Sequence, residues 1–461
     1  MAGGYQFNRV PQPVPGTRTR FRQILTPIPA PGTAEILDHL ARVESRSMQG
    51  QMPIVWDRAV GSSVFDIGGN RYIDFTCTIF VTNIGHANER VLAAVRETLD
   101  RGLVHTYAYA HKKRVEYLDR LLAFAGPPFE KAFLLSAGTE ATEAALKLMR
   151  LHGQQAGKRR CGILCIENNW HGRTMGAQLM SSNPEQKAWI GHQDPDIHHI
   201  PFPYPWTLQG RSGEEFLETG LQGLREAGLD LERDLCGVML ETFQGWGAVF
   251  YPPDFVQGIE TLCRRNGLLL AFDEMQAGFA RTGRKFGYEH YDVQPDLLCC
   301  GKGMGSGFPL SGVIGPASVM DLPEVGNMSS THSANPVVCA AGLATLEEIE
   351  SRNLVAESER KGRIFHDRLN AIQRKFPDRI AWVLGRGMIA ALLFQNPETG
   401  QPEGLFPSRV CERAMQKGLL LVHTGRESIK LSPPLTIEEE ALLEGLDVLE
   451  ESLAEIQREC R

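Results

Sequence analysis

An aspartate and a lysine, Asp273 and Lys302, each follow a short apolar run in the stretch from Leu268 to Gly307. The runs are LLLAF before Asp273 and LLCCG before Lys302, and runs of this kind form buried strands. In open α/β sheets ligands bind at the strand ends, and an apolar setting makes a lone acid or amine costly without a partner. We therefore predict that the two side chains emerge side by side with a charged ligand between them.

Two further apolar runs end in residues that can bind a ligand. Glu241 ends the run CGVMLE and is followed by Gln244 in TFQGWGA. The run CGILCIE leads to Trp170, His171, Gly172 and Arg173, where an indole could stack on a flat ring and an arginine could bind a carboxylate with two hydrogen bonds. The alternative is that the aromatic residue caps the core from a loop.

A candidate phosphate site lies in residues 131–150, KAFLLSAGTEATEAALKLMR, where an apolar run opens directly into a predicted helix. The small residues of Ser136–Thr139 would let backbone N–H groups approach an anion, which the helix dipole also favours. A plain N-cap by Ser136 or Thr139 is the alternative. Together with the other motifs, the segment favours phosphate binding. The apolar face of this helix comprises Ala141, Ala144, Ala145, Leu148 and Met149.

Two other sites are not supported. The residues His192, Asp194, His198 and His199 lie in a proline-rich segment without ligand-like spacing, so we interpret the segment as a loop and predict no metal site. The glycines of GKGMGSGFP have the wrong spacing for a dinucleotide fingerprint, and a proline breaks the helix that should follow.

The elements that must position these residues alternate between strand and helix, which predicts a βαβ-type sheet covered by helices. Before them, TAEILDHLARVES predicts a short helix from Thr33, and Gly68-Gly69-Asn70 predicts a hairpin turn. A helix from about Asp254 should end at Asn266-Gly267. After the stretch that carries Lys302, a long helix begins at Pro336 and a second follows it.

The part from Ile380 reads as a separate α/β unit with a strand pair, a helix, two more strands and a final helix. Thr436 and Glu439 have the spacing of a capping box for that final helix. We divide the chain into an N-terminal arm (1–33), an N-terminal segment (34–85), a large ligand-binding domain (86–341) and a small C-terminal domain (342–461).

Composition points to a globular enzyme. The 461 residues are 42% hydrophobic and 22% charged with a formal net charge of −7, which argues against nucleic-acid binding. The first residues lack the apolar core of a signal peptide, and no run approaches the roughly 18 apolar residues of a membrane span. We expect a cytoplasmic enzyme that binds no membrane, with its ten cysteines mostly as buried thiols.

Together the motifs resemble the class III aminotransferases, pyridoxal-phosphate enzymes of fold type I, and among them the 4-aminobutyrate aminotransferase branch. The resemblance runs from about Ile54 to the C-terminus. It implies a large domain with a mostly parallel mixed sheet covered by helices, and a smaller α/β lobe built from the C-terminal part and the N-terminal segment. The implied cofactor is pyridoxal 5'-phosphate. Lys302 would form a Schiff base with it and later move a proton, and Asp273 would keep the pyridine nitrogen protonated.

The resemblance also implies the other cofactor contacts. Thr331, in SSTHSANP, matches a threonine that reaches the phosphate of the neighbouring subunit, which implies a homodimer with shared active sites. Trp170 stands where the family usually has phenylalanine or tyrosine. The expected contacts are Gly138 and Thr139 with the phosphate, Trp170, His171 and Met275 with the ring, and Gln276 with the phenolic oxygen.

Substrate recognition is implied for a second set of residues. Arg173 matches an arginine that takes a distal carboxylate, and Glu241 matches a glutamate that pairs with a second arginine until an α-carboxylate displaces it. That second position is Lys430 here, which keeps the charge but not the two-pronged geometry. We also expect Gln244 at the substrate, with Ile79 and Phe80 of TCTIFVTN, a segment that would suit a bulky substrate.

We expect a two-stage ping-pong reaction that moves an amino group between a primary amine or omega-amino compound and a 2-oxo acid, with glutamate and 2-oxoglutarate as one couple. Three alternatives remain open. They are transamination of a specialised metabolite such as an amino-sugar aldehyde, an aminomutase or decarboxylase on the same scaffold, and a cofactor-free scaffold protein.

Overall fold

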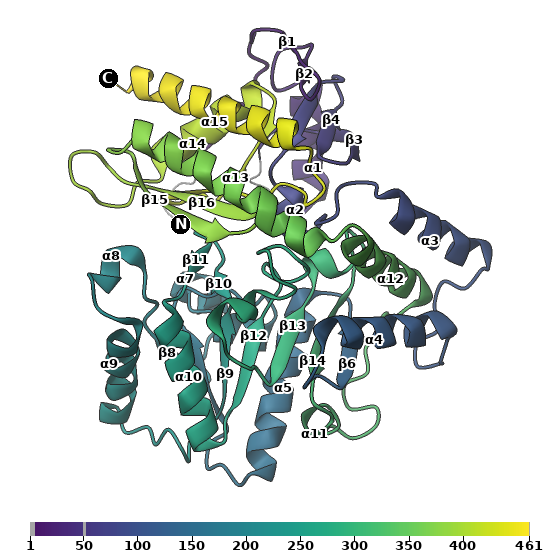
Figure 1. Ribbon diagram of the computed structural model, residues 1–461, viewed down its shortest axis with the longest axis vertical. Helices are drawn as coiled ribbons and strands as arrows, with labels where there is room; N and C mark the ends of the chain where they lie inside the picture. The colour runs from purple at the N-terminus through teal and green to yellow at the C-terminus, as the bar shows by residue number, and fades with distance from the viewer. Residues whose placement is uncertain (1–4, 49–51, 461) are drawn as a thin grey trace. The chain divides into compact units, whose positions relative to one another are not determined.

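The computed structural model describes residues 5–48 and 52–460, and these divide into two compact units. Unit 1 consists of the described part of Met1–Asn88 together with Trp246–Ala248 and Ala356–Arg461. Unit 2 consists of Glu89–Gly245 and Val249–Val355. The α/β class predicted from the sequence is confirmed (Figure 1), because unit 2 is built on a mixed sheet with helices packed against it.

The central sheet of unit 2 is mostly parallel, as predicted. Five neighbouring strands run parallel to one another, and β14 is antiparallel to the strand on each side of it. The order across the sheet is β6 (Lys131–Leu135), β14 (Ser311–Gly315), β13 (Leu297–Cys300), β12 (Leu269–Asp273), β9 (Leu235–Glu241), β7 (Gly162–Ile166) and β8 (Ile197–Ile200).

One face of this sheet packs against α5 (Gly138–Gln155), the helix predicted after the apolar run at 131–135. Leu269 and Ala271 of β12 belong to the same buried cluster as Ala145 and Met149 of α5. Side chains alternate along a strand, so Asp273 projects from the α5 face as well. The register of β12 therefore decides which side of the sheet carries the acid.

The other elements of unit 2 surround this core. The predicted helix end at Asn266 is confirmed, with Gly267 in the left-handed conformation at φ +59°. The helices are α3 (Glu89–Asp100), α4 (Lys112–Ala125), α6 (Met175–Met180), α7 (Pro184–Lys187), α8 (Pro205–Leu208), α9 (Gly213–Glu226), α10 (Pro253–Asn266), α11 (Ala317–Met320) and α12 (Pro336–Ser351), with the 3₁₀ turns η2 (Ala188–Ile190), η3 (Gly287–Tyr291) and η4 (Lys302–Met304) and the hairpin β10 (Phe243–Gln244) and β11 (Val249–Phe250).

Unit 1 contains two sheets. The first has the order β1 (Thr17–Arg18), β2 (Gln23–Ile24), β5 (Arg71–Asp74), β4 (Ser63–Asp66) and β3 (Trp56–Val60), with β17 (Leu419–Leu420) parallel to β5. The second has the order β15 (Ile380–Arg386), β16 (Ile389–Phe394), β19 (Ser428–Leu431) and β18 (Val422–His423). Its helices are α1 (Thr33–Val43), η1 (Arg46–Met48), α2 (Cys77–Phe80), α14 (Leu405–Gln416), α15 (Glu439–Glu459) and most of α13 (Leu354–Lys375).

The segment α2 is a left-handed turn made without glycine. Its four residues have φ values of 47°, 52°, 62° and 71°, and two of them, Thr78 and Ile79, are β-branched. The carboxylate of Asp74 accepts hydrogen bonds from the backbone N–H groups of Thr76, at 2.7 Å, and Cys77, at 3.2 Å. The turn thus holds a conformation that is unfavourable for these residues because its flanks are fixed.

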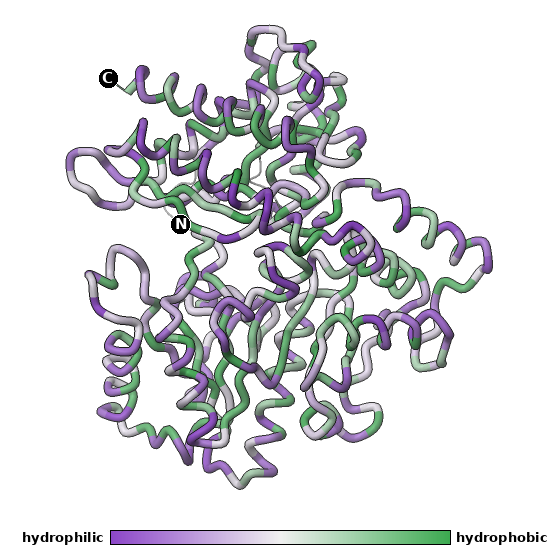
Figure 2. Tube along the Cα trace, in the orientation of Figure 1, coloured by the Kyte–Doolittle hydropathy of each residue, from purple (hydrophilic) through white to green (hydrophobic). Residues whose placement is uncertain are grey.

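Two local predictions were wrong. The final helix is preceded by Glu438 as N-cap, and the hydroxyl of Thr436 donates instead to the carbonyl of Ile84 at 3.2 Å, so no capping box forms. His198 and His199 lie in β8 and not in a loop. Figure 2 shows hydrophobic and hydrophilic residues alternating along α15, as expected for a helix that buries one face. In the described part of the chain, no helix is long and apolar enough to span a bilayer.

Candidate functional site

Two buried carboxylates end neighbouring strands of unit 2. Asp273 and Glu241 are directly paired in the parallel register of β12 and β9, and their exposed fractions are 5% and 4%. Both side chains project from the face that packs on α5, because Met239 and Ala271, two residues earlier, belong to the α5 cluster. The predicted convergence of acidic residues at this edge of the sheet is thus present.

Asp273 is held by a histidine. Its Oδ2 lies 2.9 Å from Nδ1 of His171, and its Oδ1 accepts a hydrogen bond from the backbone N–H of Met275 at 3.1 Å. The backbone of His171 is fixed on both sides, since its N–H donates to Ser181 Oγ and its carbonyl accepts from Thr142 Oγ1, both at 2.8 Å. The other ring nitrogen, Nε2, is buried and has no hydrogen-bond partner among the residues that the structure describes.

Glu241 accepts hydrogen bonds from three N–H groups of unit 2. Its Oε2 accepts from the backbone N–H of Trp170 at 2.9 Å and of Gly245 at 3.3 Å, and its Oε1 accepts from Gln276 Nε2 at 3.4 Å. Burial raises the pKa of Glu241 to about 8 because it disfavours the charged form, and the nearby Asp273 adds to this effect. The carboxyl group is therefore poised to change charge near neutral pH.

Lys302 follows β13 and opens the turn η4 with φ +44°, a conformation uncommon for a residue with a side chain. Burial lowers the pKa of Lys302, while the charges of Asp273 and Glu241 act in the opposite direction. A lowered pKa increases the fraction of neutral amine, which is the nucleophilic form. The structure therefore brings the acid and the lysine predicted from the sequence into electrostatic contact.

The start of α5 packs tightly against this site. A Cβ at Gly138 would lie 2.8 Å from Sδ of Met275, and one at Gly301 would lie 2.5 Å from the same sulfur. The N-cap is Ala137, so the proposed cap by Ser136 or Thr139 is wrong. The hydroxyl of Thr139 instead lies 2.6 Å from that of Thr174. The first turn of α5 also contains Glu140, whose Oε2 accepts hydrogen bonds from the backbone N–H groups of Ser136, at 2.9 Å, and Ala137, at 2.8 Å.

Two predicted substrate residues of unit 2, Arg173 and Gln244, differ in their surroundings. The side chain of Arg173 is exposed and its Cζ lies over the ring of Trp170, 4.5 Å from the centroid. Gln244 is fully buried, and both its amide nitrogen and its oxygen lack partners among the described residues. Such an amide needs a polar ligand or water to satisfy it.

The remaining predicted residues are spread over both units. Thr331 is exposed in unit 2, and its carbonyl lies 2.7 Å from Nε2 of His105. In unit 1, the buried Lys430 has its Nζ 4.3 Å from the ring centroid of Phe80, while Ile79 is 41% exposed on the left-handed turn. The pairing of Glu241 with Lys430 stays a prediction, since the two residues belong to different units.

Several supporting residues were missed from the sequence. Ser311 donates its hydroxyl to the carbonyl of Ala137 at 2.7 Å and so fixes the start of α5. Glu274 is buried beside Asp273 and accepts from Thr242 Oγ1 at 2.7 Å and from two backbone N–H groups. The adjacency of two acids after an apolar run could have indicated Glu274, but a serine on another strand leaves no local signal.

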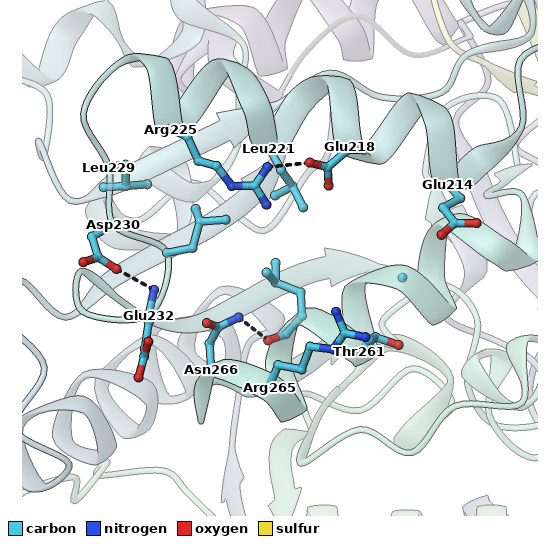
Figure 3. A pocket seen from close by; sticks show the side chains of 13 residues that line it. Glu214, Glu218, Leu221, Arg225, Leu229, Asp230, Glu232, Thr261, Arg265 and Asn266 are labelled. Carbon is cyan, nitrogen blue, oxygen red and sulfur yellow. Dashed lines mark hydrogen bonds and ion pairs between the residues drawn. The ribbon is translucent and has the colours of Figure 1, made fainter.

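Other candidate sites do not compete with this one. Within residues 5–48 and 52–460, no group of three or more histidine, cysteine or acidic side chains could hold a metal ion. A pocket between α9 and α10 (Figure 3) is lined by Arg225, Leu229 and Arg265 among others. These residues lie in the helices and turns before β9 and β12, at the opposite ends of the strands from Glu241 and Asp273.

Comparison with known proteins gives consistent results. Residues 45–453 match the family described as aminotransferase class-III. The chain is 33% identical to a 4-aminobutyrate aminotransferase of Mycobacterium leprae (strain TN), over 94% of this chain and 98% of that protein. A solved ornithine aminotransferase from Toxoplasma gondii ME49 matches with a TM-score of 0.82 and 25% identity, over 94% of this chain and 97% of that one. Another structure of an ornithine aminotransferase from Toxoplasma gondii, described as having partial occupancy of PLP at its active site, matches with a TM-score of 0.79 and 27% identity, over 92% and 95%.

Proposed function

The chain belongs to the class III aminotransferases, and we propose that it exchanges amino groups between a primary amine or omega-amino compound and the glutamate/2-oxoglutarate couple. The enzyme is a pyridoxal-phosphate-dependent transaminase of fold type I that transfers an amino group to a 2-oxo acid. The observation that carries the proposed site is the juxtaposition of Asp273, Glu241 and Lys302, three ionisable groups at one edge of the sheet.

The residues at this edge fit the cofactor. Pyridoxal phosphate supplies an electron-accepting ring, which stabilises charge at the substrate carbon when its nitrogen is protonated. The carboxylate of Asp273 would keep the ring nitrogen protonated by pairing with its positive charge. His171 and the backbone N–H of Met275 fix the orientation of this carboxylate. The unpartnered Nε2 of His171 and the side-chain amide of Gln244 offer buried polar atoms that a bound group can satisfy. The backbone N–H groups of Gly138 and Thr139, in the first turn of α5, suit the phosphate, while those of Ser136 and Ala137 donate to Glu140.

Lys302 would carry the covalent attachment and the proton transfer. A neutral amine is needed for both steps, and burial favours it by lowering the pKa of Lys302. The backbone of Lys302 has φ +44°, and residues held in such sparsely populated conformations cluster at active sites.

Substrate recognition would use Arg173 for a distal carboxylate and Glu241 with Lys430 for an α-carboxylate. The exposed guanidinium of Arg173 suits a planar carboxylate. Glu241, with a pKa of about 8, can be neutral or charged at neutral pH. This supports a gate that accepts both a carboxylate-bearing substrate and an amine that lacks an α-carboxylate.

The attachment is tested by reducing the holoenzyme with borohydride and mapping the modified peptide by mass spectrometry. The expected result is a modified Lys302, no modification in Lys302→Ala, and loss of turnover in that variant. Lys285→Ala is the control, because Lys285 is an exposed lysine of the same stretch. Full turnover in Lys302→Ala would overturn the assignment.

The role of Lys430 is tested by restoring an arginine. Because a guanidinium binds a carboxylate with two parallel hydrogen bonds, Lys430→Arg should lower the apparent Kd for 2-oxoglutarate in the half-reaction by about threefold to tenfold, the effect of ~1 kcal/mol. An amine donor without a carboxylate is the control substrate and should be unaffected. An unchanged rate and affinity for 2-oxoglutarate would remove Lys430 from this role.

The proposal includes a homodimer with shared sites. The segment between α3 and α4 exposes Val104, Tyr107 and Tyr109 by 53%, 43% and 81%, an apolar surface that is unusual for a monomer. His105 in this segment contacts the carbonyl of Thr331, the residue expected to reach the phosphate of the neighbouring subunit. The apolar surface and Thr331 are thus adjacent, which supports a second copy of the chain as the occupant.

We also place the enzyme in the cytoplasm. All ten cysteines are free thiols, which is typical of a reducing compartment. Cell fractionation followed by an activity assay tests this, and recovery of the activity outside the cytoplasmic fraction would contradict it.

A further inference from the structure

The segment from Trp170 to Thr174 is fixed along its backbone. The N–H of Trp170 donates to Glu241 at 2.9 Å, and the N–H of His171 donates to Ser181 at 2.8 Å. At the other end, the N–H of Thr174 donates to Thr139 Oγ1 at 3.3 Å. The backbone positions of Trp170 and Arg173 are therefore set by the same strands and helices that hold the ionisable groups.

The side chain of Arg173 is not fixed in this way. It is exposed and forms no ion pair with the residues that the structure describes. The side chain of Arg173 contacts the half-buried indole of Trp170. The Cζ atom of Arg173 lies over this ring, 4.5 Å from the ring centroid. Tryptophan is the aromatic residue that attracts a cation most strongly.

Arg58 over Phe65 and Arg211 over Phe216 are also stacked without an ion pair to a described residue, whereas two other stacked arginines have one. Arg379 lies over Phe406 and also binds Glu403 at 2.9 Å, and Arg426 lies over Trp246 and also approaches Glu427 at 3.5 Å. In both cases the guanidinium already forms an ion pair with a carboxylate of the protein. Arg173 has the aromatic support but keeps its N–H groups for a carboxylate from outside.

We propose that Trp170 is a positioning residue for substrate specificity. Its indole ring stacks on the flat face of the Arg173 guanidinium, and the N–H groups at the edge of the guanidinium stay available for the second carboxylate of a dicarboxylic substrate. A stacked guanidinium uses its face for the ring, whereas a carboxylate binds at the edge, so both contacts coexist. Prior ordering of a long side chain lowers the entropy lost on binding. The inference rests on the proposed role of Arg173.

The test measures binding of two unreactive acids to the holoenzyme by calorimetry. Glutarate carries a second carboxylate and butyrate does not, so the ratio of their Kd values cancels effects common to both. Trp170→Phe should weaken the binding of glutarate relative to butyrate by at most about twofold to fivefold, since this range corresponds to loss of a whole exposed cation–π contact and phenylalanine keeps part of it. Trp170→Tyr gives a second variant with the same expected direction, should Trp170→Phe fold poorly. Trp382→Phe, in β15 of unit 1, is the matched control and should leave the ratio unchanged.

A double-mutant cycle with Arg173→Met shows whether Trp170 acts through the arginine. In the Arg173→Met background, Trp170→Phe should no longer change the ratio, whereas a purely structural role of Trp170 would still change it. Equal weakening of both acids, or an unchanged ratio, in Trp170→Phe would overturn the inference. If Arg173→Met itself does not weaken glutarate binding, the proposed role of Arg173 fails instead.

Discussion

Replacing Glu241 by glutamine should remove a pH dependence from the reaction with 2-oxo acids. The backbone N–H groups of Trp170 and Gly245, which donate hydrogen bonds to Glu241, can donate to a glutamine oxygen as well. The fold around the position is therefore retained. What changes is the charge, because burial raises the pKa of Glu241 to about 8 and a glutamine does not ionise. The substitution therefore isolates the effect of one negative charge.

The magnitude follows from this pKa. With a pKa of about 8, roughly nine-tenths of the enzyme has a neutral Glu241 at pH 7 and about one-tenth at pH 9. In the proposed recognition of the α-carboxylate, an ionised Glu241 would repel that group. We therefore expect kcat/KM for 2-oxoglutarate to fall by about tenfold between pH 7 and pH 9, beyond any change shared with other substrates.

The assay is the pH profile of kcat/KM for 2-oxoglutarate divided by that for an aldehyde acceptor without a carboxylate. Both acceptors react with the same form of the enzyme in a two-stage reaction, so the division removes titrations that belong to that form, including that of the proposed Lys302. In the wild type the quotient should fall above pH 7, and in Glu241→Gln it should be flat. A flat quotient in the wild type, or the same fall in Glu241→Gln, would refute the assignment of Glu241 as a charge-dependent gate.

Two further predictions concern stability and assembly. Burial raises the pKa of Glu274 to about 7, so the folded protein keeps this proton longer than the unfolded chain, and the free energy of unfolding should decrease as pH rises from about 4.5 to about 7. Urea unfolding of Glu274→Gln should show a shallower decrease, and an identical slope would contradict this. Tyr109→Glu should convert the proposed homodimer to a monomer in size-exclusion chromatography with light scattering, because it places a charge on the apolar segment between α3 and α4. A dimer of unchanged stability would place the interface elsewhere.

The parts of the site that follow from local patterns were predictable from the sequence. Asp273 and Lys302 each end an apolar run, and the parallel sheet brings such ends together regardless of the intervening chain. Glu241 follows the same rule. The start of α5 was predictable because a short run of small residues separates the apolar strand pattern from the helix pattern. These features depend on one strand or one helix at a time.

Residues that act across the fold were not predictable. Thr142 and Ser181 fix His171 from α5 and from the end of α6, and no spacing in the sequence connects them. The capping box at Thr436 failed for a similar reason, since its hydroxyl binds the carbonyl of Ile84 far away in the chain. When a polar side chain can form a hydrogen bond either with a neighbour in the sequence or with a residue far away in the chain, the sequence pattern indicates only the neighbour.

The left-handed turn at Cys77–Phe80 has a consequence for protein engineering. Each of its four residues has a Cβ in a backbone region that glycine occupies freely, at a cost of roughly 1–2 kcal/mol per residue. Libraries randomised at Thr78 and Ile79, the two exposed residues of the turn, and selected for heat resistance should therefore become enriched in glycine. Such enrichment would report relief of backbone strain and not improved turnover, so heat resistance and catalysis need separate selection here.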